Sequence, residues 1–412
     1  MKIVFYNHTG KVSGAERLLL NALARLDGVE FDRIMVCPAD GPLAGLAAEA
    51  GMTVHTVANL EARFTWRPGA FLRYGKSFVK VISDFRRKII ELNPDLIHAN
   101  SIRAGLVATG ATLGLKMKVV WHLHDLLPRH PLSSAIRMVA ALSKRSRMIA
   151  VSQAVRRNFC GLLAPSLNNR ITVILNAIDL KNFSAVSNDR EESRKGLSLE
   201  KDDFAIGIVG QLTPRKGQME LLEAFEKLSR KVPRAILVIA GAAIFNRDCE
   251  YEELLRSTAP RLGISHRVRM LGARKDVPEI MRALDLLVVN SRREPFGLVA
   301  CEAMAVGTPV LATACDGLPE IIDHRRNGWL VPFGDQQTLV DALAFLAERP
   351  EVRSTLAGVA REDVEQRFAL ERYMNELQAF YRLHGRQADW SVTVPVTTTA
   401  ASETLALQST RN

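Results

Sequence analysis

Short apolar runs alternate with longer segments of helical period along the first 180 residues of the chain. The runs are rich in Val, Ile and other strand-forming residues, and most of them are separated by enough residues for a helix. We expect strands at residues 2–7, 32–38, 52–58, 95–100, 118–124, 147–152 and 171–175. Strands that alternate with helices in this way form a mostly parallel sheet covered on both faces. The pattern therefore predicts a doubly wound α/β domain over residues 1–180.

A second alternation of the same kind begins after a polar, charged stretch at residues 181–203. Its apolar runs predict strands at residues 204–210, 234–241, 267–272, 284–290, 308–313 and 328–332. A chain of 412 residues also exceeds what one hydrophobic core usually supports. We therefore expect a second sheet domain over residues 181–365, with a cleft between the two domains. Residues 385–412 are rich in Thr, Ser and Ala without a helical period, and we expect a disordered tail there.

The chain carries 55 Lys and Arg residues against 44 Asp and Glu residues, a formal net charge of +11. Such a charge favours anionic partners, which are nucleic acids, anionic lipid headgroups or phosphorylated small molecules. Two stretches, residues 61–90 and 129–147, combine basic with apolar residues. They are typical of amphipathic helices on a membrane surface, although the solvated helix faces of a basic protein explain them equally well. No apolar run approaches the roughly 20 residues that span a bilayer.

The five cysteines are scattered and show no C-x-x-C spacing. They are Cys37, Cys160, Cys249, Cys301 and Cys315. This spacing argues against a disulfide framework and against a zinc site. Residues 1–10 lack the long apolar segment of a signal peptide. We therefore expect a protein of the reducing cytoplasm that binds no metal and is at most peripheral on the inner face of the membrane.

The segment EPFGLVACE, residues 294–302, runs from an expected strand into an expected helix. In open α/β sheets, ligands bind at the carboxyl ends of the strands. Glu294 would lie in the loop there, and Glu302 about one turn inside the helix. Free backbone N–H groups at the start of the helix form a phosphate site, around Phe296, Gly297, Leu298 and Val299. A phosphate flanked by carboxylates that accept hydrogen bonds from hydroxyls fits a nucleotide-sugar.

The segment GQLTPRKG, residues 210–217, is another strand-to-helix loop. Arg215 and Lys216 precede a helix, where cations oppose the helix dipole unless an anion lies between them and the helix. The loop lacks the Walker A pattern, which argues against an ATPase. In the first domain, Gly14 follows the first strand in a glycine-containing loop, but the G-x-G-x-x-G fingerprint of dinucleotide binding is absent.

The run WHLHD ends another strand and places His122 and His124 on the same side of it. We expect His124 or Asp125 to point into the cleft as part of a sugar site, while a structural role within the sheet is equally compatible with His122. No histidine or cysteine at metal-ligand spacing lies nearby. Asn100 and Ser101 come at the end of the preceding strand, where we expect weaker contacts with an acceptor.

Together these motifs resemble the retaining glycosyltransferases of family 4, which have the GT-B fold. The resemblance is carried by SGAER at residues 13–17, by GQLTPRKG, by EPFGLVACE and by GLPEIIDHRRNGWLV at residues 317–331. It covers nearly the whole chain apart from the tail. It implies two facing Rossmann-like domains, with a C-terminal helix at residues 366–384 that packs back on the first domain. It also implies transfer with net retention of configuration and without a metal ion.

The resemblance further implies roles for individual residues. The catalytic candidates are Glu294, His124, Lys216 and Arg215. The donor-binding candidates are Gly14, Arg215, Lys216, Glu294, Phe296, Gly297, Leu298, Val299 and Glu302. Glu302 would hold the ribose of the donor, and Glu294 would contact hydroxyls of the transferred sugar. Arg215 and Lys216 would neutralise the diphosphate. His124 would lie near the anomeric centre, and Gly14 would approach the donor from the first domain.

One position departs from the family pattern. Gln211 follows the glycine of the phosphate loop, where many relatives have arginine. Unless Arg215 takes over that role, the donor phosphates are expected to bind more weakly than in those relatives.

We therefore expect a glycosyltransferase that moves a hexosyl unit from a nucleoside-diphosphate sugar to a hydroxyl acceptor. The acceptor would be a lipid-linked saccharide in the synthesis of a cell-surface polysaccharide, and no cofactor is expected besides the donor itself. Two alternatives remain open. A nucleotide-sugar 2-epimerase would use the same architecture. A nucleic-acid-binding protein would explain the charge, although only 6% of the residues are aromatic and no recognition motif is present.

Overall fold

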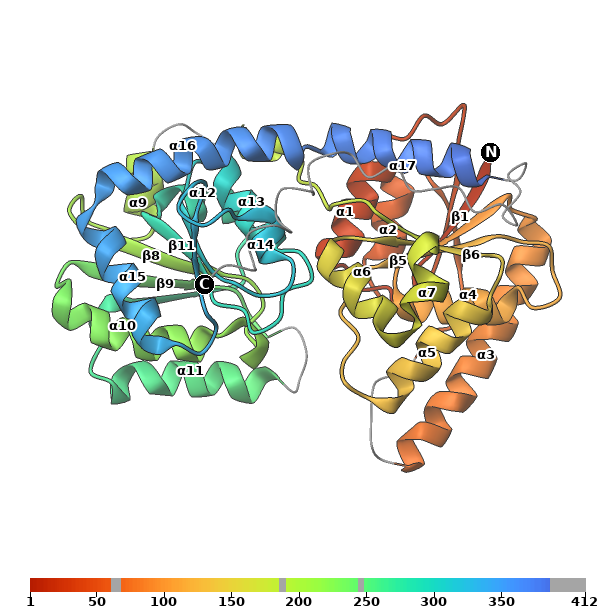
Figure 1. Cartoon of the computed structure of the whole chain (residues 1–412), viewed down its shortest axis with the longest axis horizontal. Helices are drawn as coiled ribbons and strands as arrows, with labels where there is room; N and C mark the ends of the chain where they lie inside the picture. Colours follow the sequence, from red (N-terminus) through yellow and green to blue (C-terminus); the bar gives the residue numbers. More distant parts are fainter. Residues whose placement is uncertain (61–67, 185–189, 244–247, 386–412) are drawn as a thin grey trace.

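The computed structural model describes residues 1–60, 68–184, 190–243 and 248–385. It contains two parallel sheets with helices on both faces, and the two units lie side by side (Figure 1). This arrangement confirms the expected α/β class with two doubly wound domains. The expected tail at residues 385–412 lies outside the described residues except for Gly385.

The first sheet has seven parallel strands in the order β3-β2-β1-β4-β5-β6-β7. The strands are β1 (Lys2–Tyr6), β2 (Asp32–Cys37), β3 (Thr53–Thr56), β4 (Leu96–Ala99), β5 (Val119–Leu123), β6 (Ser146–Ala150) and β7 (Ile171–Val173). The helices of this domain are α1 (Gly14–Leu23), α2 (Leu43–Glu49), α3 (Pro68–Leu92), α4 (Ile102–Ala111), α5 (Pro131–Leu142), α6 (Gln153–Cys160) and α7 (Ala164–Leu167). In the register of the sheet, Val4 pairs with Ile34 on one side and with Ile97 on the other. All seven expected strands are present.

The second sheet has six parallel strands in the order β10-β9-β8-β11-β12-β13. The strands are β8 (Phe204–Val209), β9 (Ala235–Ala240), β10 (Val268–Gly272), β11 (Leu286–Val289), β12 (Val310–Thr313) and β13 (Trp329–Val331). The later helices are α8 (Leu180–Ser184), α9 (Arg190–Gly196), α10 (Gln218–Lys231), α11 (Cys249–Arg261), α12 (Val277–Ala283), α13 (Leu298–Ala305), α14 (Leu318–Ile321), α15 (Gln336–Glu348), α16 (Pro350–Arg367) and α17 (Leu370–His384). All six expected strands of this half are present as well.

Each sheet buries apolar side chains on both of its faces. Alternate residues of a strand point to opposite faces. In the first sheet, Ile3 and Phe5 pack with α1 and α2, whereas Val4 and Tyr6 pack with α3 and α4 on the other face. The second sheet is divided in the same way between α10 on one face and α13 on the other. The near-continuous apolar strands in the sequence follow from burial on both faces.

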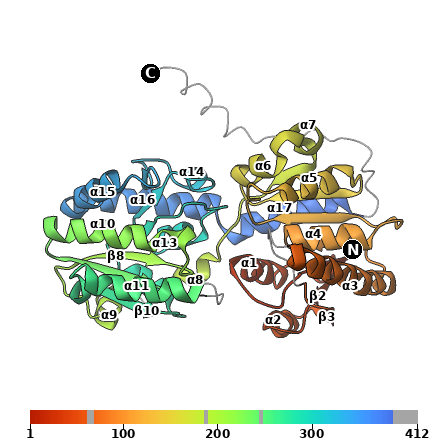
Figure 2. The ribbon, with the colours of Figure 1, turned by 90° about the horizontal axis from the view of Figure 1, so that it is seen from below.

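The last helix crosses from the second domain to the first. α16 lies along the second domain, and α17 continues over the first (Figure 1 and Figure 2). Tyr373, Leu377 and Tyr381 of α17 are buried in the same core as α1 and α2. The crossing lies beside the first connection between the domains, because Ile178 forms an isolated parallel bridge with Ala369. Two chain segments therefore join the domains at one place.

The strand order reverses at one point in each sheet. In the first sheet, β1 lies between β2 and β4, and in the second sheet β8 lies between β9 and β11. The helices after β8 and β11 leave toward opposite faces, so the loops at residues 210–217 and 290–297 diverge. Such a reversal is where ligands bind in open α/β sheets. The strand-to-helix loops that the sequence analysis identified as candidates for the site lie beside these two reversals.

Gly217 is a residue at which the backbone of the loop after β8 packs against the loop after β11. Its φ of +70° lies in the left-handed region, and a Cβ atom there would collide with the carbonyl oxygen of Asn290. Asn290 also donates from Nδ2 to the Gly217 carbonyl oxygen at 2.9 Å. Only glycine satisfies both the backbone conformation and the close approach.

We expect Gly217→Ala to lower the free energy of unfolding by about 3 kcal/mol, from left-handed strain plus the collision. Gly263→Ala is the matched control, because Gly263 has a φ of +72° and a Cβ atom there would meet no other atom within 4 Å. We expect the control to cost only about 1 kcal/mol. Urea unfolding monitored by circular dichroism measures both values. Equal losses in the two variants would contradict the role of the Asn290 contact.

Candidate functional site

An ion pair joins the loops after β8 and β11. Lys216 places Nζ 2.5 Å from Oε2 of Glu294. The same carboxylate oxygen accepts a hydrogen bond from Ser291 Oγ at 2.9 Å. Arg215 donates from Nη1 to the carbonyl oxygen of Arg293 at 3.0 Å. The structure thus brings Arg215, Lys216 and Glu294 together at the point where the second sheet reverses its strand order.

The start of α13 lies directly after this loop. Gly297 is the N-cap, with a φ of 117°, and a Cβ atom there would lie 2.7 Å from Leu318 Cδ2. The N–H groups of Leu298 and Val299 belong to the first turn and have no acceptor within the helix. They give the second domain a helix N-terminus beside the Lys216–Glu294 pair. Phe296, by contrast, is only 2% exposed, and its ring packs 5.8 Å from that of Phe368. Its side chain anchors the loop, so only its backbone is available to a ligand.

Glu302 lies on the second turn of α13 among buried neighbours. These neighbours are Ala300, Cys301, Ala303 and Met304. Burial raises the pKa of the Glu302 carboxyl group, and the positive charges of Arg17 and Lys216 offset part of that rise. Arg17 belongs to α1 of the first domain, so cations from both domains act on this carboxylate. Arg17 was not singled out from the sequence, although it ends the SGAER motif.

The start of α1 approaches the start of α13 across the domain boundary. A Cβ atom on Gly14 would lie 3.4 Å from Cδ1 of Leu298. Ser13 and Glu16 form a capping box at this end of α1, in which the Glu16 carboxylate accepts a hydrogen bond from the Ser13 N–H at 2.9 Å. The structure therefore places Gly14 beside the helix terminus of the second domain, with its backbone held by the cap.

His124 and Asn100 meet at the carboxyl ends of β5 and β4. His124 Nε2 lies 2.9 Å from Asn100 Oδ1. Burial lowers the pKa of His124 to about 3, so its ring is neutral at pH 7. Ser101 caps α4 by accepting a hydrogen bond from the Ala104 N–H at 3.0 Å, and its Oγ lies 2.9 Å from His8 Nδ1. Ser101 thus has a structural partner on each side.

Charged groups of the two domains also meet around Asp125. Desolvation raises the pKa of the Asp125 carboxyl group, the positive charges of Arg103 in the first domain and Arg215 in the second offset part of that rise, and the negative charge of Glu16 adds to it. Neither Arg103 nor Glu16 was identified from the sequence. The rule that side chains after the carboxyl end of a strand face the site would have suggested Arg103, which follows β4 by four residues.

Two further contacts hold the domains together beside this site. Ser152 Oγ donates to the Pro295 carbonyl oxygen at 2.6 Å. The two oxygens of Glu320 accept hydrogen bonds from the N–H groups of Gln153 and Ala154, each at 2.7 Å. Glu320 thereby caps α6 of the first domain from the second domain. Burial raises the pKa of the Glu320 carboxyl group, and these two hydrogen bonds offset part of the rise. From the sequence, Glu320 could be placed only at a helix start.

Gln211, at the position where many relatives have arginine, is engaged within the second domain. Its side-chain Nε2 donates to Asp248 Oδ2 at 2.9 Å, and its backbone carbonyl oxygen accepts a hydrogen bond from Gln218 Nε2 at 2.8 Å. The guanidinium group of Arg215 lies on the Arg293 carbonyl. In this conformation, neither Gln211 nor Arg215 takes the place of the arginine that many relatives have directly after the glycine.

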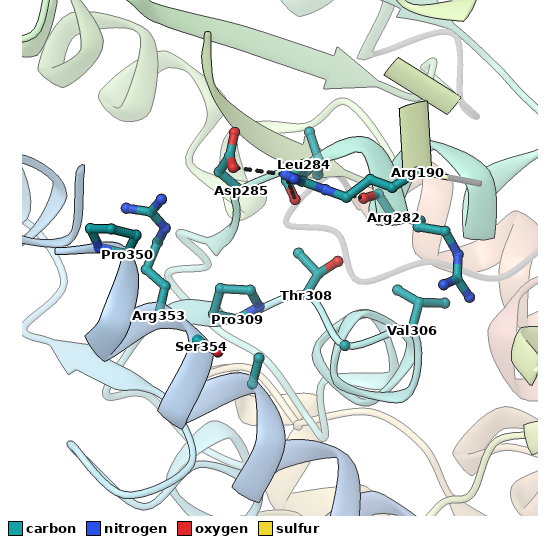
Figure 3. Close-up of a pocket in the computed structure, with 12 residues that line it drawn as sticks. Arg190, Arg282, Leu284, Asp285, Val306, Thr308, Pro309, Pro350, Arg353 and Ser354 are labelled. Atoms are coloured by element: carbon teal, nitrogen blue, oxygen red, sulfur yellow. Dashed lines mark hydrogen bonds and ion pairs between the residues drawn. The ribbon is translucent and has the colours of Figure 1, made fainter. Parts of the chain in front are cut away.

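A cavity of about 310 Å³ lies at the opposite end of the second sheet (Figure 3). It is lined by residues just before β11 and β12, including Asp285 and Pro309. Arg190 and Arg194 donate to the two oxygens of Asp285, at 2.7 and 3.1 Å. Because this cavity is at the amino ends of the strands, it is separate from the loops described above.

Within the described parts of the chain, no group of three or more His, Cys, Asp and Glu side chains is arranged to hold a metal ion. None of the described helices has the length and apolar character required to cross a membrane.

Both halves of the chain match family models. Residues 12–182 match the model described as Glycosyltransferase Family 4, and residues 189–363 match the model described as Glycosyl transferases group 1. A D-inositol 3-phosphate glycosyltransferase of Saccharomonospora viridis is 37% identical over 210 residues, which are 50% of this chain. The match spans about half of that relative's length, 48%.

Two other similarities extend over most of the chain. A UDP-Gal:alpha-D-GlcNAc-diphosphoundecaprenol alpha-1,3-galactosyltransferase of Escherichia coli is 22% identical over 381 residues, covering 90% of this chain and 94% of the relative. The crystal structure of Anabaena HepE in complex with UDP and glucose superposes with a TM-score of 0.78 at 29% identity, covering 93% of this chain and 99% of that one. The superposition on this structure, together with the two parallel sheets, confirms the expected pair of Rossmann-like domains.

The half-buried carboxylate of Glu302 gives a prediction about pH. Its pKa is raised in the folded state, so the folded protein binds a proton there more tightly than the unfolded chain does. The wild type should therefore lose stability as the pH rises from about 4 through the raised pKa. Glu302→Gln lacks this loss, and we expect its stability advantage over the wild type to grow from pH 4 to pH 7. Urea unfolding at several pH values measures it.

The control is Glu362→Gln on α16, where the side chain is exposed. For this variant, the difference from the wild type should not change with pH. A Glu302→Gln difference that is equally flat would show that burial of the Glu302 charge costs the fold nothing.

Proposed function

Because the chain belongs to the glycosyltransferases of family 4, we propose that it transfers a hexosyl unit from a nucleoside-diphosphate sugar to a hydroxyl group, with retention of configuration at the anomeric carbon. The observation that carries the proposal is the meeting of three features at one point. These are the Lys216–Glu294 pair, the N-terminus of α13 and the half-buried carboxylate of Glu302. A diphosphate with a ribose at one end and a sugar at the other would engage all three.

The phosphates of the donor would lie between the cations and the helix. Arg215 and Lys216 each carry a positive charge, and the N–H groups of Leu298 and Val299 are free to donate. Glu302 would accept hydrogen bonds from the ribose hydroxyls. The cost of burying that carboxylate is offset when hydroxyl donors solvate it in the complex. The UDP complex of the 29% identical Anabaena protein supports a uridine donor.

Lys216 would act before and during the breaking of the sugar–phosphate bond. In the structure, its ammonium group neutralises Glu294 at 2.5 Å. When the sugar–phosphate bond breaks, negative charge grows on the leaving diphosphate, and a fixed cation there stabilises the transition state more than the ground state. Glu294 would then be free to accept hydrogen bonds from hydroxyls of the transferred sugar. Lys216 and Arg215 would supply the positive charge, and we propose transfer without a metal ion.

The first domain would bind the acceptor. His124, Asn100 and Asp125 lie at the carboxyl ends of its strands, and the positive charge of Arg215 in the second domain acts on the Asp125 carboxyl group. The contacts of Ser152 and Glu320 join the two domains and would help to keep bulk water from the donor. The Escherichia coli relative, whose name specifies a diphosphoundecaprenol substrate, supports a lipid-linked saccharide as acceptor.

A lipid-linked acceptor would require a membrane-facing surface, and the first domain offers one. α4 contacts both α3 and α5, so these helices form one layer. Val79 of α3 is 69% exposed, and Leu142 of α5 is 72% exposed. Lys76 and Lys80 are exposed on α3 beside Val79. Residues 61–67 of the basic stretch lie outside the described residues. Exposed apolar side chains among lysines are typical of helices that lie on an anionic bilayer, and we propose that this layer does so.

The first test is donor binding and turnover. UDP at about 100 times its Kd should raise the free energy of unfolding by about 2.7 kcal/mol, measured as a shift in melting temperature. Glu302→Ala should abolish the shift. With UDP-sugar and a saccharide acceptor, Lys216→Ala should lower kcat/KM about 100-fold or more, because it removes a charge aimed at the leaving group. Lys195→Ala, an exposed lysine of α9, is the control and should retain full activity.

The products decide between the remaining functions. Nuclear magnetic resonance of the product should show the anomeric configuration of the donor, and EDTA should leave the rate unchanged. Release of an epimer from the donor alone would support the epimerase alternative. Absence of a shift with UDP, GDP and ADP would contradict the donor site.

A separate test concerns the membrane surface. The protein should co-sediment with vesicles that contain anionic lipid, and less so at high salt. Replacing Lys76 and Lys80 together by Ala should weaken partitioning about 30-fold, from about 1 kcal/mol for each lysine near the surface. The control replaces Lys195 and Lys201, exposed lysines of the second domain, and should bind like the wild type. Failure of the wild type to sediment at any salt concentration would exclude this surface as a membrane site.

A further inference from the structure

A line of buried polar side chains runs through the first sheet, from α17 to the loop after β1. It begins at Tyr381 of α17, passes His98 of β4 and His122 of β5, and reaches His124 and Asn100 at the strand ends. The proposed function uses only the last two of these groups. Buried polar side chains are costly unless they are hydrogen-bonded, so this line requires an explanation of its own.

The direction of the first hydrogen bonds follows from Tyr381. Its hydroxyl lies 2.8 Å from His98 Nδ1 and has no other partner among the described residues. Since burial raises the pKa of Tyr381 and lowers the pKa of His98 to about 3, the phenol keeps its proton and the imidazole is neutral. The phenol therefore donates to Nδ1, which leaves the His98 proton on Nε2. That nitrogen lies 3.2 Å from His122 Nδ1, so the proton of His122 is on its own Nε2.

The direction at the other end follows from a backbone carbonyl. Asn7 places Nδ2 2.7 Å from the carbonyl oxygen of Thr9, which can only accept. The Oδ1 of Asn7 therefore faces Asn100 Nδ2, at 3.3 Å. Asn100 is left with Oδ1 toward His124, so His124 must donate from Nε2 and carry its lone pair on Nδ1.

The link between His122 and His124 is a ring contact and not a hydrogen bond. The two rings have their centroids 4.0 Å apart and their planes at 38°, and His122 Nε2 and His124 Nδ1 are buried without a partner among the described residues. Every hydrogen bond on either side of this contact donates in the same direction, from Tyr381 toward Thr9.

We propose that these groups form one directed chain, in which the hydrogen bonds from Tyr381 through His98 fix the ring of His122 and that ring holds the adjacent ring of His124. Tyr381 is thereby a positioning residue for His124. The ring of His122 and the hydrogen bond to Asn100 together hold the imidazole of His124 in one orientation and one tautomer, at the edge where the proposed function places the acceptor. The catalytic part of this inference rests on the proposed function, whereas the chain itself does not.

The direction of the chain can be measured without any activity. In protein labelled with ¹⁵N at histidine, long-range ¹H–¹⁵N correlations distinguish the two neutral tautomers and the charged ring. We expect His98, His122 and His124 to be neutral with the proton on Nε2 at pH 7. An Nδ1–H tautomer or an imidazolium at any of the three would overturn the proposal.

The positioning role is tested by a matched pair of variants on α17. Tyr381→Phe removes the hydroxyl that starts the chain, and Tyr373→Phe removes a buried hydroxyl that has no partner among the described residues. We expect Tyr381→Phe to lower kcat about tenfold and to leave the Kd of UDP unchanged, since the effect of one buried hydrogen bond falls on the sugar and not on the nucleotide. Tyr373→Phe should change neither value. Equal kcat values in the two variants would overturn the role of Tyr381.

A second pair covers the case in which Tyr381→Phe does not fold. His98→Gln keeps an amide N–H donor toward His122, whereas His98→Leu removes it. We expect the His122 proton to stay on Nε2 and kcat to stay within about twofold in His98→Gln, and both to be lost in His98→Leu. Equal behaviour of these two variants would also overturn the proposal. If the wild type transfers no sugar, the proposed function fails, and the tautomers still decide whether the chain exists.

Discussion

The reversal of strand order beside β1 and beside β8 is the constraint on which the site depends. At each reversal, the following helices leave toward opposite faces, α1 and α4 in the first domain and α10 and α13 in the second. The loops between them must diverge, and polar side chains can gather there without entering a core. In the second domain the two loops are then drawn together by the Gly217–Asn290 contact and by the Lys216–Glu294 ion pair. The reversal of strand order thus leaves space for a ligand between the loops, and the few side chains in these contacts determine the shape of that space.

Three carboxylates near the site are withdrawn from solvent to different degrees, and the negative charge of each is compensated in a different way. Glu294 is paired with Lys216 and Ser291. Glu320 is satisfied by two backbone N–H groups of the facing domain. Glu302 is half-buried, and the positive charges of Arg17 and Lys216 partly offset the cost of its desolvation. A carboxylate whose pKa is raised by desolvation is typical of functional sites. On this reasoning, Glu302 is the one of the three for which we expect a ligand as partner.

Much of the fold could be predicted from the sequence, because burial on both faces produces continuous apolar strands that stand out from the helical segments between them. The sequence also predicted that the loop with Arg215 and Lys216 and the segment with Glu294 and Glu302 belong to a site, because ligands bind at strand ends in α/β sheets. It did not predict the contacts of Glu320 and Tyr381. Glu320 caps a helix of the other domain 166 and 167 residues away, and Tyr381 reaches a histidine 283 residues away. Such contacts follow from how the domains pack, and no local pattern records them.

The position of the two connections limits how the domains can move. Ile178 donates to the Phe368 carbonyl oxygen at 2.9 Å and accepts a hydrogen bond from the Leu370 N–H at 3.1 Å, so the outgoing and returning segments are bonded to each other. α17 is fixed to the first domain by its buried face and by the bidentate Arg382–Glu30 pair at 2.7 Å. A rotation about the paired segments would leave these bonds intact and would break those of Ser152 and Glu320. The bonds of Ser152 and Glu320 lie beside the loop that carries Glu294. The interdomain contacts that such a rotation would break are therefore the ones that border the site. Access for a donor therefore requires little disruption of either core.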